Sequence, residues 1–427
     1  MTKATPRPAE LSGATGRRAN RTRPADPVPR CRRPSGYAAR ALTALLVLLA
    51  AVLGAVPPAP LAAAGPTVAR PAELAGPPPG PVAMPTVRAR SFLLADAVTG
   101  QVLLARDAAR ARPMASTTKV MTALLVLERL PQQRVVTIGP GPTRTSTPST
   151  LGLRAGEHLT VRQLLLGLML ESANDAAVAL AEAVDSSEAA FVRRMNQRAT
   201  ALGLTATHYA SAHGLDRPGH RTSARDLARL WTVAMRRADF RALVATERAT
   251  IPGPRPLRRF SNRNELLFSY RWTEGGKTGF TNLARRCLVA SASRGGRRLL
   301  AVALGSPNAF TDLRALFEYG FTALVRARLA RAGQVVRAPA GGWQVTANVD
   351  ALVRRDLLGR VALRVAPAAP GQGGAPAAWV VAGTSVIAPV AVRPADGAAS
   401  PETLRPGPVP PGAGSPRIDP FLAPRAA

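Results

Sequence analysis

An apolar run of 16 residues, from Ala41 to Val56, separates a short N-terminal region from the part of the chain that can fold into domains. The first 64 residues carry ten basic and two acidic side chains, and the run is followed by a small-residue stretch that ends at Ala64. A basic flank, an apolar core and a small-residue site are typical of a secretory signal. Residues 1–64 are therefore predicted to be a basic N-terminal region with a signal peptide or signal anchor, and we expect the rest of the chain to lie outside the cytoplasm.

Changes in composition divide the remaining chain into four regions. Residues 65–88 are rich in proline and show no periodic apolar pattern, which predicts a linker. Residues 89–325 have a globular composition, and residues 331–395 alternate valine with polar positions, which predicts a small β-rich domain. Residues 396–427 are again rich in proline and are predicted to be a disordered tail, with no amphipathic stripe for membrane binding.

The globular region combines strand and helix patterns. Residues 90–94 and 101–105 predict a β-hairpin, and residues 288–292 and 299–304 predict two further strands around a glycine turn. Helices are predicted from about Ser116 to Leu130 and from Thr160 to Ala183. The second helix begins with a capping box, in which Thr160 and Gln163 would satisfy each other's backbone donors.

The net charge of +32 reflects an unusual preference for arginine. Only three of the 57 basic residues are lysines, and they are Lys3, Lys119 and Lys277. With abundant alanine, glycine and proline, this preference indicates a G+C-rich genome. A basic surface favours anionic lipids, wall polymers or nucleic acid, but the sequence shows no nucleic-acid-binding signature and only 4% aromatic residues. We expect no nucleic-acid partner.

Cysteine and histidine offer little chemistry. Only Cys31 and Cys287 are present, and the first precedes the predicted cleavage site, so a mature chain would have no internal disulfide. Cys287 lies in an apolar run and is predicted to be buried in a strand. The four histidines lack metal-ligand spacing, so no metal is expected.

The first motif with catalytic potential is Ser116-Thr117-Thr118-Lys119. On a helix, positions i and i+3 share a face, so the Lys119 amine could take a proton from the Ser116 hydroxyl. A serine needs such a base to become a nucleophile. Arginine does not deprotonate in proteins, which makes a lysine at this position informative in a chain that otherwise uses arginine. An ordinary helix start is the alternative interpretation.

Two further motifs follow along the chain. Ser172 and Asn174 come after an apolar helical run and could line a cleft, where Ser172 could shuttle a proton. Lys277-Thr278-Gly279 follows two glycines, so a substrate backbone could approach closely, and Lys277 and Thr278 could bind a carboxylate. A phosphate loop is excluded because Arg271 occupies the position that requires glycine.

The combination and order of these motifs resemble the low-molecular-mass penicillin-binding proteins, the serine D-alanyl-D-alanine carboxypeptidases. The resemblance extends over residues 89–322. Besides the motifs, it rests on these segments: Asp96-Ala97-Val98-Thr99-Gly100-Gln101-Val102-Leu103, Ala201-Leu202-Gly203-Leu204, His213-Gly214-Leu215-Asp216, Thr222-Ser223-Ala224-Arg225-Asp226-Leu227-Ala228 and Asn262-Arg263-Asn264-Glu265-Leu266-Leu267.

The resemblance implies an α+β transpeptidase-like fold, an antiparallel sheet flanked by helices, with the small β-rich domain following it. It implies removal of the terminal D-alanine from peptidoglycan pentapeptides through an acyl-enzyme, inhibition by β-lactams and no cofactor. The implied roles are Ser116 as nucleophile, Lys119 as base, Ser172 and Asn174 in the proton path, Lys277, Thr278 and Gly279 in substrate binding, and the backbone N–H groups of Ser116 and Phe280 as the oxyanion hole.

The chain departs from the family pattern at three places. Ala309-Phe310 replaces an Arg-Phe pair whose arginine helps to hold the substrate carboxylate, so binding could depend on Lys277 and Thr278 or on Arg298 or Arg314. Ala284-Arg285 replaces Ala-Gly after the third motif. The C-terminal amphipathic anchor of the family is missing, which leaves the N-terminal segment as the possible membrane tether.

Four other functions are alternatives to the carboxypeptidase that the resemblance implies. A hydrolase triad built on His213 and Asp216 lacks the G-x-S-x-G elbow, and we interpret these residues as a turn. A β-lactamase would need a deacylating glutamate before Leu-Asn, which residues 262–267 do not provide. A peptidoglycan endopeptidase and a weakly active wall-binding scaffold remain open.

Overall fold

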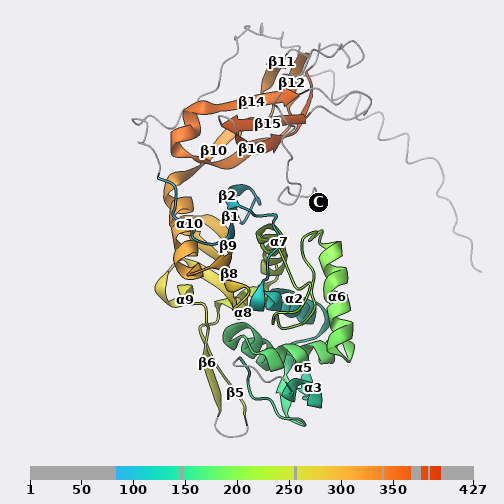
Figure 1. Ribbon diagram of the computed structural model, residues 1–427. Coiled ribbons are helices and arrows are strands. Elements are labelled where there is room, and N and C mark those ends of the chain that lie inside the picture. The colour runs from blue at the N-terminus through green and yellow to red at the C-terminus, as the bar shows by residue number, and fades with distance from the viewer. Residues whose placement is uncertain are drawn as a thin grey trace, which may run out of the picture. The chain divides into compact units, whose positions relative to one another are not determined.

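The computed structural model describes residues 83–144, 149–253, 257–338, 341–366, 377–382 and 385–395 (Figure 1). The predicted signal segment 1–64, most of the linker 65–88 and the tail 396–427 lie outside the described residues. Within the described ranges, no helix is both long and apolar enough to span a bilayer.

A five-stranded antiparallel sheet forms the centre of the predicted globular region. Its strands are β1 (Ser91–Asp96), β2 (Val102–Arg106), β7 (Thr273–Thr281), β8 (Arg285–Arg294) and β9 (Arg297–Ser306). They lie in the order β2-β1-β9-β8-β7, which makes β7 an edge strand. The predicted hairpin of β1 and β2 and the predicted pair β8 and β9 are both confirmed. Gly295 and Gly296 join β8 to β9 with φ values of +57° and +71°, as a tight hairpin turn requires.

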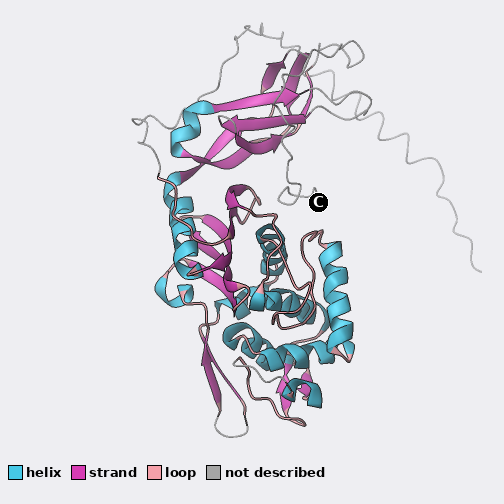
Figure 2. Cartoon of the chain, viewed as in Figure 1, coloured by secondary structure: helices cyan, strands magenta, loops and turns pink. Residues whose placement is uncertain are grey.

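Both faces of this sheet are buried, which explains the nearly continuous apolar runs of its strands. Along β9, Leu300 and Val302 belong to one apolar cluster, whereas Leu299 and Ala301 belong to the other. Such alternation follows from the period of two along a strand. Figure 2 shows helices on both sides of the sheet. The principal ones are α2 (Lys119–Arg129), α5 (Asn174–Asp185) and α7 (Ala224–Met235) on the first cluster and α10 (Ala309–Ala323) on the second.

The chain between β2 and β7 builds the helical layer that carries α2, α5 and α7. A 3-10 turn (Ala115–Thr118) precedes α2, so the predicted start of this helix at Ser116 falls within that turn. The remaining elements are α3 (Pro140–Thr143), α4 (Val161–Leu166), α6 (Glu188–Ala201), α8 (Ala238–Ala245), α9 (Leu266–Ser269) and two short antiparallel strand pairs, β3 (Val135–Thr137) with β4 (His158–Thr160) and β5 (Arg248–Ile251) with β6 (Arg258–Ser261).

The predicted helix from Thr160 to Ala183 is not continuous. Its capping box is confirmed, since Thr160 accepts from the Gln163 backbone and Gln163 accepts in return. After α4, however, a π-helical turn (Gly167–Glu171) interrupts the helix, and α5 begins only at Asn174. The expected single helix is therefore wrong, and the interruption falls at the second motif.

The last part of the described chain is rich in strands. They are β10 (Leu324–Ala330), β11 (Val335–Ala338), β12 (Gly341–Val345), β13 (Val349–Arg354), β14 (Val361–Ala366), β15 (Ala377–Ala382), β16 (Ser385–Val390) and β17 (Val392–Pro394), with a 3-10 helix at Arg355–Arg360. Strand β10 pairs with β13, β12 lies between β11 and β17, and β15 lies between β14 and β16. A separate apolar cluster, which includes Val345, Val380 and Val390, packs among these strands.

Phe317 tests the packing of α10 against the sheet. Its ring is fully buried and stacks with Tyr270 and Phe321 at centroid distances of 6.1 Å and 6.5 Å. We expect Phe317→Ala to lower the free energy of unfolding by about 3–5 kcal/mol, because it leaves a cavity in the core. Phe268, which is 45% exposed, provides the control, and Phe268→Ala should cost less than about 1 kcal/mol. Equal losses in urea denaturation of the two variants would contradict this account of the core.

Candidate active site

The first motif forms a serine–lysine pair at the start of α2. The 3-10 turn brings the Ser116 Oγ within 2.9 Å of the Lys119 Nζ. Ala115, just before the serine, has a φ of +47°, a conformation that costs an alanine about 1–2 kcal/mol. The chain thus makes a sharp, strained turn to present Ser116.

Lys119 is completely buried and has three polar neighbours. Its Nζ lies 2.9 Å from the Ser116 Oγ, 2.7 Å from the Asn174 Oδ1 and 2.5 Å from the His213 carbonyl oxygen. A neutral amine has two N–H groups and one lone pair. Two N–H groups can donate to Asn174 and His213, which leaves the lone pair directed at the Ser116 hydroxyl. The neighbours therefore suit a base.

The electrostatics of the site favour that neutral amine. Burial is the main cause that lowers the pKa of Lys119 well below its ordinary value, because a charged amine loses its hydration. The positive charges of Lys277 and Arg263 lower this pKa further, and the Asp175 carboxylate opposes them. The Asp175 carboxylate itself accepts hydrogen bonds from the backbone N–H groups of residues 151, 153 and 176.

The second motif lies at the interruption between the π-helical turn and α5. Ser172 adopts a left-handed conformation with φ +64° and ends the π-helical turn. Its Oγ lies 3.0 Å from the Lys277 Nζ, while Asn174, at the start of α5, accepts from Lys119. The motif thus bridges the two lysines, one through each of its polar side chains. A π-helical turn at such a place fits the frequent occurrence of these turns at functional sites.

The third motif lies on the edge strand β7. Lys277 is 1% exposed, and its Nζ also donates to the Thr278 carbonyl oxygen at 3.0 Å. Burial, followed by the charge of Arg263, lowers the pKa of Lys277 to about 7, against the opposing effect of Glu171. A carboxylate that binds beside this amine would raise the pKa of Lys277 again and so favour its charged form.

Gly279 lets β7 approach Ser116. A Cβ atom at this position would lie 2.9 Å from the Ser116 backbone nitrogen and 3.1 Å from the Met114 carbonyl oxygen. Any side chain would therefore separate the strand from the serine. Phe280, the next residue, is 58% exposed. Because β7 is an edge strand, an extended peptide could pair with its backbone.

His213 and Asp216 do not form a catalytic triad. The His213 ring accepts from the Leu215 backbone N–H and lies 3.6 Å from Glu188, so it faces away from Ser116, and its contribution to the site is its carbonyl oxygen. Asp216 accepts from the Thr281 hydroxyl at 2.8 Å, which links this turn to the end of β7. These contacts are structural ones within a loop, and the interpretation of the segment as a turn that shapes the domain stays a prediction.

The arginines weighed for carboxylate binding are engaged elsewhere. Ala309 is buried at the start of α10. Arg298 pairs with Glu274 at 2.8 Å, and Arg314 donates to the Ser269 carbonyl oxygen and lies over the Tyr270 ring. Cys287 is buried as predicted, and burial raises the pKa of its thiol to about 12. The described residues contain no group of three or more side chains suited to hold a metal.

Arg263 is the charged residue that the sequence reasoning did not single out. It forms an ion pair with Glu171 and donates to the Ser149 hydroxyl at 3.1 Å, so it lies beside the second motif. Its charge lowers the pKa of both active-site lysines. In the sequence, its position between Asn262 and Asn264 belongs to a segment of family likeness and carries no chemical signal of its own.

A serine paired with a buried lysine at the start of a helix, beside an antiparallel sheet flanked by helices, is the arrangement of the serine hydrolases of the penicillin-recognising class. The sequence profile described as D-alanyl-D-alanine carboxypeptidase matches residues 80–308. The chain therefore belongs to the family of serine D-alanyl-D-alanine carboxypeptidases, and the predicted fold class, family and type of enzyme are confirmed.

Individual relatives agree with this assignment. D-alanyl-D-alanine carboxypeptidase DacB2 of Mycobacterium tuberculosis is 37% identical over 252 residues, which are 57% of this chain and 86% of that protein. The Streptomyces K15 DD-transpeptidase structure is 35% identical, with a TM-score of 0.54 over 56% of this chain and 99% of the other. Penicillin binding protein 5 of Haemophilus influenzae is 25% identical, with a TM-score of 0.61 over 74% and 99%.

Gly279→Ala tests the close approach of β7 to Ser116. The added methyl group must push the strand away from Ser116, and a misplacement of about 1 Å in an active site can cost about 10²-fold in rate. We expect kcat/KM for a D-Ala-D-Ala peptide to fall by about this factor. At Gly139 a Cβ would meet nothing closer than 3.5 Å, so Gly139→Ala should keep full activity. An unimpaired Gly279→Ala enzyme would contradict the proposed contact.

Proposed function

We propose that this D-alanyl-D-alanine carboxypeptidase uses Ser116 as its nucleophile to remove the terminal D-alanine from peptidoglycan pentapeptide stems. The observation that carries the proposal is the 2.9 Å contact between the Ser116 Oγ and the buried Lys119 amine. Family membership supplies the class of substrate, and the arrangement of the three motifs supplies the residues.

Substrate binding uses the open edge of β7. The terminal carboxylate of the peptide binds the Lys277 ammonium and the Thr278 hydroxyl, and the peptide backbone pairs with the strand beyond them. Gly279 leaves room for the penultimate carbonyl group to lie beside Ser116. The backbone N–H groups of Ser116 and Phe280 then form the oxyanion hole, in which each donor is typically worth about 10²–10³ in rate.

Acylation begins when Lys119 takes the proton of the Ser116 hydroxyl. The Oγ attacks the penultimate D-Ala carbonyl carbon. The terminal peptide bond then breaks as its nitrogen receives, through Ser172, the proton that Lys119 took from Ser116. Asn174 holds the Lys119 amine in place during this transfer. Free D-alanine leaves. Water then gives a proton to Lys119 and adds to the ester carbonyl carbon. The bond from the Ser116 Oγ to this carbon breaks as Lys119 returns the proton to the Oγ, which releases the shortened peptide. No cofactor takes part, and a β-lactam would acylate the same serine.

The organisation of the chain is proposed on the sequence pattern. Residues 1–64 would export the enzyme or anchor it, residues 65–88 would link it to the membrane side, and residues 89–325 would form the catalytic domain that acts outside the cytoplasm. The β-rich domain at 331–395 would include β10 as well, because β10 pairs with β13. The tail 396–427 would carry no catalytic residue.

Ser116→Ala and Lys119→Arg test the assigned nucleophile and base. We expect Ser116→Ala to abolish both D-alanine release and labelling by benzylpenicillin, because no other group forms the ester. Lys119→Arg should lower the rate by about 10²–10⁴-fold, since it keeps the charge but loses the base. The measurements are free D-alanine from a peptide that ends in D-Ala-D-Ala and the intact mass after incubation with benzylpenicillin.

Ser269→Ala is the control, because this exposed serine only donates to the Glu265 carbonyl oxygen. Labelling that persists in Ser116→Ala would place the nucleophile elsewhere. Wild-type protein that is acylated by benzylpenicillin but releases no D-alanine from the peptide would favour the endopeptidase or the wall-binding scaffold instead.

The pH dependence of kcat/KM tests the role of Lys277. Only the protonated amine attracts the substrate carboxylate, and its pKa in the free enzyme is lowered to about 7. We therefore expect kcat/KM, which reports on the free enzyme, to fall as the pH rises through about 7. The decline in kcat should occur at higher pH, because the bound carboxylate raises this pKa. Measurements between about pH 5 and 9 on wild type and Lys277→Arg would check it.

Lys277→Arg should lose this decline, even if its overall rate is lower, because arginine keeps its charge throughout this range. A decline that persists unchanged in Lys277→Arg would assign the titration to another group.

A further inference from the structure

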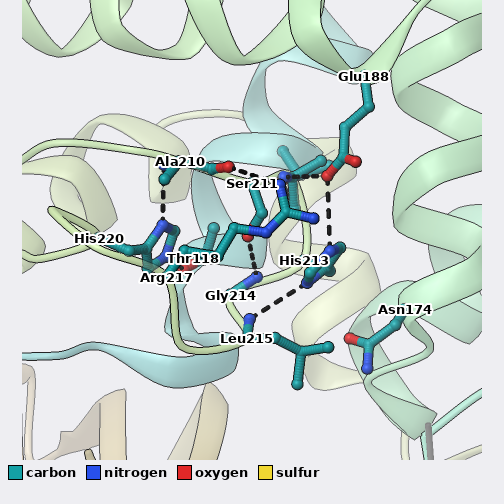
Figure 3. A network of polar contacts seen from close by, with 12 residues as sticks. Thr118, Asn174, Glu188, Ala210, Ser211, His213, Gly214, Leu215, Arg217 and His220 are labelled. Carbon is teal, nitrogen blue, oxygen red and sulfur yellow. Dashed lines mark hydrogen bonds and ion pairs between the residues drawn. The ribbon is translucent and has the colours of Figure 1, made fainter. Parts of the chain in front are cut away.

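His220 and Thr118 form a buried hydrogen-bonded pair that the proposed mechanism does not use. Thr118 lies within the first motif, between Ser116 and Lys119, and it is fully buried. The His220 Nε2 lies 2.7 Å from the Thr118 Oγ1. Figure 3 shows the His220 ring between Ala210 and Thr118, each on a different part of the chain.

The hydrogen bonds of this pair can run in only one direction. The Ala210 backbone N–H donates to the His220 Nδ1 at 2.9 Å, so that nitrogen carries no proton and Nε2 must carry one. Nε2 therefore donates to the Thr118 Oγ1. The single hydroxyl proton of Thr118 is then left for the Ala115 carbonyl oxygen, 2.7 Å away. Burial is the main cause that lowers the pKa of His220 to about 4, which agrees with a neutral ring.

These hydrogen bonds end at the Ala115 carbonyl oxygen. The same peptide unit carries the Ser116 N–H on its opposite side. The Ala115 carbonyl group and the Ser116 N–H belong to one planar trans peptide, so they point in opposite directions. Fixing the carbonyl oxygen therefore fixes the direction of the N–H. Ala115 also has the strained φ of +47°, and such a conformation persists only where its surroundings hold it.

A second contact confines the same carbonyl group. Gly214 has a φ of +96°, and a Cβ at this position would lie 2.1 Å from the Ala115 oxygen. The loop that carries His213, Gly214 and His220 is closed at its base by backbone hydrogen bonds between His208 and Arg221. The Ala115 oxygen thus lies between a rigid loop and the Thr118 hydroxyl.

We propose that Thr118 and His220 are positioning residues that aim the Ser116 N–H into the oxyanion hole by anchoring the Ala115 carbonyl oxygen. The inference rests on the proposed function, because it assumes that the Ser116 N–H stabilises the oxyanion. Neither residue touches the substrate, and their effect reaches the reacting carbonyl through one peptide plane.

Two pairs of variants separate this role from simple packing. Thr118→Val and His220→Leu keep the approximate shape and remove the hydrogen bonds, whereas Thr118→Ser and His220→Gln keep a donor and an acceptor. We expect the first pair to lower the acylation rate and kcat by about 10-fold or more with little change in KM, because the oxyanion forms only after binding. The second pair should recover most of this loss.

The signature of the oxyanion hole is the stretching frequency of the ester carbonyl group in the penicilloyl-enzyme, measured by infrared difference spectroscopy with ¹³C-labelled benzylpenicillin on the full chain. A hydrogen bond to the carbonyl oxygen lowers this frequency. We expect a higher or broadened band in Thr118→Val and His220→Leu and a band like that of the wild type in Thr118→Ser and His220→Gln. The double variant Thr118→Val/His220→Leu should lose no more rate than either single variant, because both act through one anchor.

Wild-type rates and an unshifted band in folded Thr118→Val and His220→Leu would overturn the inference. So would Thr118→Ser and His220→Gln that fold but stay as impaired as their counterparts. If the valine and leucine variants fail to fold, the band positions of Thr118→Ser and His220→Gln decide, and a shift in both despite restored hydrogen bonding would overturn it. A wild-type chain that benzylpenicillin does not acylate would instead reject the proposed function.

Discussion

The burial of two lysine amines, one beside Ser116 and the other beside Ser172, is the constraint on which the rest of the structure depends. Removing an ammonium group from water costs several kcal/mol, and the neighbours of Lys119 are neutral oxygens rather than a carboxylate that could offset this cost. The outcome is a lowered pKa, and the positive charge of Lys277 lowers it further. A fold that excludes water from these amines lowers their pKa, as a base requires. It must then supply their hydrogen bonds from its own elements.

The topology meets this demand by bringing distant segments together. The helical layer between β2 and β7 supplies Ser116 and Lys119 at the start of α2 and Asn174 at the start of α5, while the edge strand β7 supplies Lys277. Element ends are good positions for such groups, because the backbone there can adopt the left-handed conformations seen at Ala115 and Ser172. The double-sided burial of the central sheet provides the rigid support.

The sequence predicted what depends on local spacing and missed what depends on distant contacts. The Ser116–Lys119 pair follows from helical periodicity, and the capping box at Thr160 follows from two residues three apart. The π-helical interruption before Ser172 could not be predicted, because the apolar residues around it would be buried in either kind of helix. It is held by distant contacts such as the hydrogen bond from Asn174 to the Ser149 carbonyl oxygen. The place of Arg263 beside Glu171 likewise depends on the tertiary fold.

The scarcity of lysine has a consequence for chemical labelling. Besides Lys3, the only lysines of the chain are Lys119 and Lys277, and arginine does not react with acylating reagents as a neutral amine. Both active-site amines lose their protons more readily than an exposed lysine. A small amine-directed electrophile that penetrates to these buried groups would therefore have few targets, namely Lys119, Lys277, Lys3 and the amino terminus, and would leave the many arginines unchanged.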